Sequence, residues 1–198
     1  MSINNTTYTG RYFTAMKQAL DAVEVTLADG KPSDVESGFG LLSERCGQLK
    51  QSGGTLFFAG NGASAMMSSH MAVDFCKNAG VKSMAFNDVA FLTAIGNDLG
   101  YSRAFEMPLS MMGRGGDVLA TISSSGNSPN VILAIQAARR LGMSVVTLSG
   151  MKPDNQSRAL GDINFYVPGR TYGVAESVHA ILLHCWLDHF MNVQEWEG

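Results

Sequence analysis

The chain has 198 residues, 45% of them hydrophobic, which is enough to enclose one sizeable core. Its formal net charge of −3 gives no basic surface for DNA or RNA. No apolar run approaches the length of a membrane span, and the N-terminus lacks the basic-then-apolar pattern of a signal peptide. We therefore expect a cytoplasmic protein that has no nucleic-acid partner and no membrane partner.

The first fifty residues predict two helices. Apolar residues at helical spacing favour an amphipathic helix from Tyr8 to about Ala28, and turn residues at 29–33 end it. A second helix is expected from about Asp34 to Lys50. We expect these N-terminal helices, within residues 1–52, to pack on the rest of the domain or on another subunit.

From Thr55 onward, predicted strands alternate with predicted helices. The strands are expected at 55–59, 81–86, 118–122, 144–148 and 163–167, and the helices at 65–77, 102–112, 130–141, 155–160 and 174–193. Pro108 predicts a break or an irregular stretch in the helix at 102–112. This alternation predicts an α/β sandwich over 55–193, with a parallel sheet covered on both faces and ligands at the carboxyl ends of its strands. No boundary divides the chain, so residues 1–198 are expected to form a single domain.

A serine-rich loop follows the predicted strand at 118–122. Ser128 and Pro129 are typical of the start of a helix, where unpaired N–H groups favour an anion. The loop has no acidic residue, which favours phosphate over an ordinary polar connection. The candidate phosphate ligands are Ser123, Ser124, Ser125 and Ser128.

A second loop, Gly60 to Ser64, has the same layout of strand, glycine-rich turn and hydroxyl residue at a helix start. It matches neither the dinucleotide fingerprint nor the lysine-bearing phosphate loop. Because both loops follow predicted strands, we expect one shared polar site at the edge of the sheet.

The histidines lie on two predicted helices. His70 and Asp74 share a helix face, whereas Glu176 and His184 are separated by about 12 Å of helix rise. One metal could bind all four residues only if Glu176 and His184 converged on it from opposite ends of the same helix face. His179 therefore remains an alternative metal ligand to Glu176. Two imidazoles and two carboxylates suit zinc or a similar divalent ion. The alternative is a plain helix pair with a core or interface histidine. We also expect a structural His189 and a buried Cys185.

Four segments of the sequence together resemble the sugar-isomerase (SIS) domain family, and within it the bacterial phosphoheptose isomerases. They are GNGAS (60–64), NDVAFLTAIGNDLGY (87–101), RGGDVLATISSSGNSPNVI (114–132) and AESVHAILLH (175–184). The resemblance covers nearly the whole chain. It implies a flavodoxin-like three-layer sandwich in a homotetramer with active sites between subunits. It further implies interconversion of sedoheptulose 7-phosphate and D-glycero-D-manno-heptose 7-phosphate for lipopolysaccharide or other surface glycans.

The resemblance also implies roles for single residues. The four loop serines match the family's phosphate-binding loop, and Asp98 matches a substrate-contacting aspartate. Asp74 falls on the position of the base and His184 on that of the acid. The first substrate loop comprises Asn61, Gly62, Ala63 and Ser64. The family's metal-ligand positions are occupied by His70, Asp74, Glu176 and His184.

Four positions depart from the family pattern. Asp74 replaces a glutamate, Glu176 a glutamine, Asn78 an arginine and Gly173 an aspartate. The segment between Asp74 and Asn87 is also about five residues short of the family's. Aspartate reaches roughly 1.5 Å less far than glutamate, and a misplacement of about 1 Å can cost around a hundredfold in rate. These changes leave open an isomerase of a different phosphosugar or a weakly active enzyme.

The resulting hypothesis is an aldose–ketose isomerisation through an enediol. Asp74 moves the proton between C1 and C2, His184 exchanges a proton with the neighbouring oxygen, and a bound zinc polarises the carbonyl. The main alternative is a non-catalytic scaffold that binds a replication initiator protein. The histidine at position 184 favours the enzyme. A phosphosugar-sensing transcription factor would need a DNA-binding module, for which the chain has no room.

Overall fold

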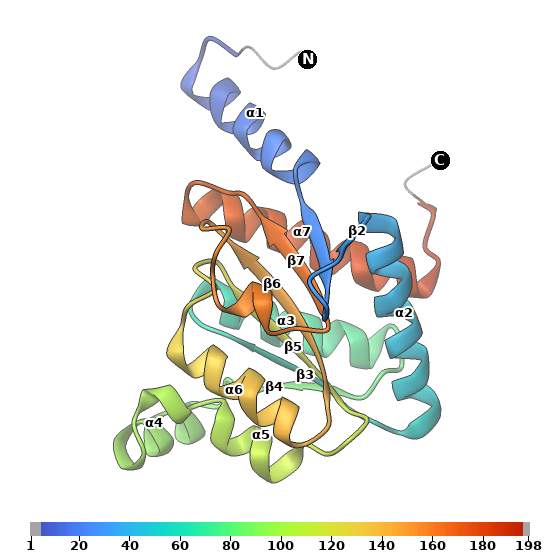
Figure 1. Cartoon of the computed structure of the whole chain (residues 1–198), viewed down its shortest axis with the longest axis vertical. Coiled ribbons are helices and arrows are strands. Elements are labelled where there is room, and N and C mark those ends of the chain that lie inside the picture. Colours follow the sequence, from blue (N-terminus) through green and yellow to red (C-terminus); the bar gives the residue numbers. More distant parts are fainter. Residues whose placement is uncertain (1–4, 196–198) are drawn as a thin grey trace.

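The computed structural model describes residues 5–195 (Figure 1), and the two ends of the expected domain 1–198 lie outside this range. A seven-stranded sheet, in the order β2-β1-β7-β6-β5-β3-β4, forms the middle layer. The strands are β1 (Glu24–Leu27), β2 (Pro32–Ser33), β3 (Leu56–Gly60), β4 (Ser83–Ala85), β5 (Val118–Ser123), β6 (Ser144–Gly150) and β7 (Ile163–Val167). The helices are α1 (Tyr8–Asp21), α2 (Val35–Ser52), α3 (Ala63–Lys77), α4 (Val89–Asp98), α5 (Glu106–Met112), α6 (Pro129–Arg140) and α7 (Tyr172–Met191).

Five of the strands form the parallel part of the sheet, in the order β4-β3-β5-β6-β7. This is the flavodoxin-like order, and it reverses between β3 and β5. At such a switch point the loops that follow two neighbouring strands diverge to opposite faces and leave a crevice. The two glycine- and serine-containing loops follow β3 and β5, so the fold brings them together there.

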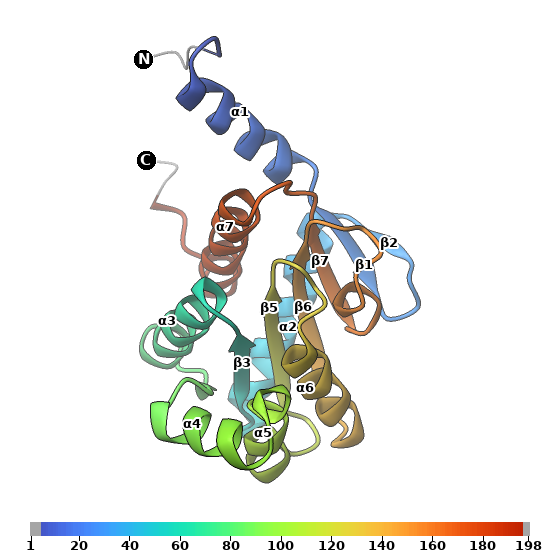
Figure 2. The same ribbon diagram turned by 90° about the vertical axis from the view of Figure 1, so that its left-hand side faces the viewer.

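Helices cover both faces of the sheet, as the edge-on view in Figure 2 shows. One core joins α2, α3 and α7 to strand residues such as Phe58, Ile122 and Phe165. The second core joins α5 and α6 to the alternate strand residues, among them Phe57, Leu119 and Val145. The strand side chains alternate between the two cores because successive residues point to opposite faces. The three-layer α/β sandwich expected from the sequence is confirmed.

The segment after α1 does not continue as a helix. The helix expected to reach Ala28 ends at Asp21, and β1 and β2 form a hairpin whose turn contains Gly30 with a φ of 75°. β1 pairs antiparallel with β7, so the sheet is mostly rather than wholly parallel, and the N-terminal region contributes strands as well as helices. The expectation of two helices over residues 1–52 is therefore wrong between α1 and α2.

Other boundaries differ locally. The break expected within 102–112 is confirmed, because the 3₁₀ turn at 101–103 and α5, which begins at Glu106, are separate. Pro108 lies in the first turn of α5, where its missing N–H group would have no intrahelical partner. Residues 101–103 and 157–159 form single 3₁₀ turns in place of longer helical segments. The segment 88–100 contains α4, which begins after the side-chain cap of Asp88. In the described part of the chain, no helix combines the length and apolar character that a bilayer crossing requires.

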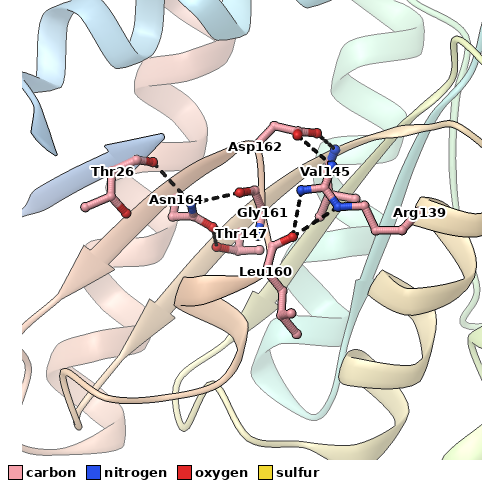
Figure 3. A network of polar contacts seen from close by, with 8 residues as sticks. All are labelled: Thr26, Arg139, Val145, Thr147, Leu160, Gly161, Asp162 and Asn164. Atoms are coloured by element: carbon pink, nitrogen blue, oxygen red, sulfur yellow. Dashed lines mark hydrogen bonds and ion pairs between the residues drawn. The ribbon is translucent and has the colours of Figure 1, made fainter. Parts of the chain in front are cut away.

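A buried polar network ties β1 to the sheet (Figure 3). The Asn164 amide donates to the Thr26 carbonyl (3.1 Å), and its oxygen accepts from the Thr147 hydroxyl (2.8 Å). Asp162 accepts from the Val145 amide (2.7 Å) and pairs with Arg139 (2.6 Å). These contacts satisfy polar groups inside the sheet and fix β1, β6, β7 and the end of α6 relative to one another.

Candidate active site

The serine loop after β5 is held by its own backbone and by a neighbouring loop. The Gly126 amide donates to the Ser123 carbonyl (2.9 Å), and the Gly126 carbonyl accepts from the Ser157 amide (2.9 Å). Gly126 has a φ of 63° and lies directly against Asn155, so a side chain there would be strained and would clash. The loop geometry therefore depends on a glycine between the serines.

Ser128 precedes the first residue of α6 but does not cap it. Its side chain makes no capping hydrogen bond, and its Oγ lies 3.4 Å from Ser123 Oγ. The hydroxyl thus points back across the loop. Pro129 has no N–H group, and the N–H groups of Val131 and Ile132 donate to the Asn130 side-chain oxygen and the Ser128 carbonyl, so the first turn of α6 leaves the Asn130 N–H for another acceptor. Such an arrangement favours an anion at the helix N-terminus.

The first loop packs closely against the second. A Cβ added to Gly60 would lie 2.7 Å from Ser64 Cβ and 2.8 Å from the Ile122 carbonyl oxygen, so only glycine allows this approach. The side chains of Asn61 and Asn130 exchange two hydrogen bonds of 2.9 and 2.8 Å, which join the β3 loop to the first turn of α6. The expected shared site at the switch point is thus a single structural unit.

Between the loops lies a cavity of about 180 Å³, called the serine cavity below. Its lining residues are Asn61, Ser64, Ile122, Ser123, Ser124, Ser125, Ser128, Tyr172 and Glu176. None of these residues is basic, so an anion would be bound by hydroxyl and N–H donors. Ser124 Oγ is buried and has no hydrogen-bond partner among the described residues, which leaves a donor for a ligand.

The serine cavity contains most of the substrate residues expected from the sequence. Gly62 and Ala63 form the turn into α3 beside it. Asp98 lies elsewhere: it is exposed at the end of α4, accepts from the Asn97 amide (2.8 Å) and lines a separate apolar cavity of about 430 Å³. Sequence reasoning missed Tyr172, although it stands four residues before Glu176 and therefore on the same helix face.

A group of metal-type ligands lies on α3 and α7. One ligand atom from each of His70, Asp74 and His184 lies within 4.8 Å of the others. His70 Nε2 is 3.2 Å from Asp74 Oδ2, and the two imidazole rings are 5.2 Å apart between centroids. Two imidazoles and a carboxylate are a donor set that suits zinc and leaves a coordination position open. These residues, called the His/Asp cluster below, fit the expected metal.

Glu176 does not belong to this cluster, and instead lines the serine cavity. The proposed alternative, His179, is wrong, because its side chain is fully buried and its Nε2 lies 3.1 Å from the Ser149 carbonyl oxygen. Cys185 is exposed rather than buried. His189 lies 2.7 Å from Ser43 Oγ and joins α7 to α2, as a structural residue would.

Residues 11–150 match the model of the SIS domain, which is more than half of the chain. The chain belongs to the sugar-isomerase (SIS) domain family. A phosphoheptose isomerase from Thiobacillus denitrificans is 31% identical over 187 residues, 90% of each chain. A phosphoheptose isomerase from Nitratidesulfovibrio vulgaris is 36% identical over 148 residues, 70% of this chain and 71% of that protein. The structure of a phosphoheptose isomerase from Neisseria gonorrhoeae superposes with a TM-score of 0.81 at 29% identity, covering 92% of this chain and 97% of that one.

The four positions at which we expect a departure from the family pattern lie on α3 and α7 or at the end of α3. Asp74 is half-buried, and its carbonyl accepts from the amide of Asn78, the residue that ends α3. A Cβ on Gly173 would lie 3.0 Å from the Tyr12 hydroxyl oxygen. The absence of a side chain at 173 therefore lets α1 approach the first turn of α7, immediately beside Tyr172 of the serine cavity.

Proposed function

We propose that this SIS-domain protein is an aldose–ketose isomerase that interconverts sedoheptulose 7-phosphate and D-glycero-D-manno-heptose 7-phosphate. The observation that carries the proposal is the combination of the serine cavity with the His/Asp cluster on the same two helices. The similarity to phosphoheptose isomerases over 90% of the chain supports the choice of substrate. The product would serve the synthesis of lipopolysaccharide or capsule heptose.

The spacing of the two regions supports a phosphosugar that reaches from one to the other. Ser64 and His70 are separated by about 9 Å of helix rise on α3, and Glu176 and His184 by about 12 Å on α7. These distances are comparable to the length of an extended seven-carbon chain. A phosphate held by the serine loop would therefore leave the C1–C2 end of the sugar near the His/Asp cluster.

In the proposed mechanism, the serine hydroxyls and the N-terminus of α6 bind the phosphate, and their binding energy positions the sugar. Asp74 transfers the proton between C1 and C2, and His184 donates or accepts a proton at the neighbouring oxygen, through an enediol. Asn61, Ser64 and Glu176 contact the sugar hydroxyls. A zinc or similar ion held by His70, Asp74 and His184 would supply Lewis-acid polarisation of the carbonyl.

We further infer a cytoplasmic homotetramer with active sites between subunits. The position of Asp98 supports such an assembly, because within one chain it is exposed and does not line the serine cavity. In a tetramer, Asp98 would reach the sugar bound to a neighbouring copy. Exposed apolar side chains on α4 and α5, such as Phe91 and Met111, would then be covered.

An isomerase with another phosphosugar substrate is the second candidate. It is favoured by the shorter reach of Asp74, because a base displaced by about 1 Å lowers the rate on the usual substrate. The replication-initiator scaffold has no comparable support, since it needs neither the His/Asp cluster nor a phosphate cavity.

The deciding experiment is an isomerase assay on a panel of ketose phosphates, with elemental analysis of the same purified sample. We expect turnover of sedoheptulose 7-phosphate in preference to the others, together with one divalent metal per chain. Preferred turnover of another sugar would select the second candidate. Intact tetramers with neither metal nor turnover would select the scaffold.

A further inference from the structure

The mechanism leaves one fully buried histidine without a role. His179 lies on α7 between Glu176 and His184, and its Nε2 is 3.1 Å from the Ser149 carbonyl oxygen. Because a carbonyl oxygen only accepts, Nε2 must carry the hydrogen, which fixes the tautomer of the ring. Burial lowers the pKa of His179 to about 4, so the imidazole is neutral near neutral pH. It is therefore a fixed hydrogen-bond donor inside the protein.

The acceptor of this hydrogen bond lies at the end of β6, directly beside the serine loop. Ser149 pairs in register with Ser123, the last residue of β5. A Cβ on the next residue, Gly150, would lie 3.1 Å from the Ser124 carbonyl oxygen and 3.3 Å from Ala175 Cβ. The end of β6 is thus enclosed between the serine loop on one side and α7 on the other.

These contacts connect His179 to the serine cavity through backbone atoms. Ser124 contributes both the carbonyl that packs on Gly150 and the buried, unpartnered hydroxyl that lies in the serine cavity. A shift of Gly150 would therefore move the donors of the loop. Closely packed interiors transmit such shifts because there is little free volume to absorb them.

We propose that His179 is a positioning residue for the serine loop: its hydrogen bond to Ser149 fixes the end of β6, against which Ser124 is placed for phosphate binding. The proposal rests on the proposed function, since it assumes a phosphosugar in the serine cavity. Loss of the donor leaves the buried Ser149 carbonyl without this partner, and the strand end then moves to find another. The effect falls on binding of the phosphate rather than on proton transfer at the distant C1–C2 end.

The test compares two substitutions at one position. In His179→Gln the amide nitrogen reaches about as far as Nε2 and keeps a donor for Ser149, whereas His179→Leu removes the donor. We expect His179→Leu to raise the KM for sedoheptulose 7-phosphate roughly tenfold while kcat changes less than about twofold. His179→Gln is expected to restore most of the KM. If the leucine variant does not fold, Gly150→Ala probes the same contact, and its added methyl group should also raise KM.

Thr147→Val is the matched control, because it removes a buried hydrogen bond from the same strand (Figure 3). We expect it to lower Tm without raising KM. Equal KM values for wild type and for both His179→Leu and Gly150→Ala would overturn the proposal, as would an equal rise in KM in the threonine control. Absence of wild-type turnover on any ketose phosphate and of inorganic phosphate binding would instead overturn the proposed function itself.

Discussion

The serine cavity and the His/Asp cluster are built in different ways. The serine cavity forms from two loops packed backbone to backbone, with glycines at 60 and 126 where a Cβ would clash and a glycine at 150 where a Cβ would be in tight contact. The His/Asp cluster consists of side chains on helix surfaces, and the side chain of His70 is 52% exposed against 21% for Asp74. One region depends on close packing, and the other on the relative position of α3 and α7.

This difference corresponds to two chemical tasks. A phosphate is the same group on every phosphosugar, so a rigid loop with fixed donors can bind it. Proton transfer needs only a few side chains whose length is matched to the substrate. The side chain of Asp74 is one methylene shorter than that of glutamate, which is enough to alter that match. Substitutions in the cluster should therefore change kcat, and substitutions in the cavity should change KM.

The largest effect is expected for Asp74→Asn, which removes the proposed base. We expect kcat for sedoheptulose 7-phosphate to fall by about a thousandfold, with phosphate binding unchanged, because general-base catalysis contributes about 10² to 10⁴-fold. Asp74→Glu, which keeps a carboxylate, is the control and should retain measurable turnover. Full activity of the asparagine variant would remove Asp74 from the role of base.

The next effect concerns stability in acid. The pKa of His179 is lowered by burial from its ordinary 6.5 to about 4. Between these values the unfolded chain binds a proton that the folded chain does not, so the free energy of unfolding falls as the pH decreases. The total loss from this group is about 3 kcal/mol. It should be complete near pH 4 and absent above about pH 6.5.

Urea unfolding of wild type and His179→Gln between pH 7 and pH 4 measures this loss. Because the carboxylates titrate in both proteins, the difference between the two curves isolates the histidine. If the free energy of unfolding falls equally with pH in both proteins, His179 is protonated as easily in the folded chain as in the unfolded one.

Removal of the metal from the His/Asp cluster should lower kcat and leave phosphate binding in the serine cavity unchanged. Dialysis against a chelator is expected to lower kcat by about a hundredfold, and added zinc to restore it, because a Lewis acid lowers the activation barrier by several kcal/mol. Calorimetry of inorganic phosphate binding, before and after chelation, should give the same affinity. Activity that is indifferent to chelation would eliminate the metal from the mechanism.

The smallest effect is expected in the cavity itself. Ser124→Ala should raise KM for sedoheptulose 7-phosphate about tenfold, the value of one hydrogen bond to a charged group, and leave Tm unchanged. Ser157→Ala is a close control, because its hydroxyl is also buried without a partner but does not line the cavity. A similar KM in both alanine variants would indicate that the phosphate binds elsewhere.

Local signals in the sequence were sufficient for the sandwich and for the two loops. The strand at 163–167 has the expected bounds, since an apolar run between turn residues leaves little ambiguity. β1 was missed because Val23 and Leu27 also fit the helical spacing of the preceding segment. The signal that could have identified it is Asp29-Gly30, a hairpin turn dipeptide, after the β-branched Val25 and Thr26.

The candidate site depended more on the fold than on local pattern. His70 and His184 lie 114 positions apart, and only the packing of α3 against α7 brings their rings together. Helix rise and the angle between side chains on a helix did not reveal whether Glu176 or His179 points toward His70 and His184. His179 points into the core and Glu176 into the serine cavity, because the orientation of α7 on the sheet decides which of its faces is buried.

The most direct test is a structure of the Asp74→Asn protein with sedoheptulose 7-phosphate bound. We predict that the phosphate lies within hydrogen-bond distance of Ser124 Oγ, with the C1–C2 end of the sugar beside His184. A phosphate bound outside the serine cavity, or a sugar whose C1–C2 end points away from the His/Asp cluster, would contradict it.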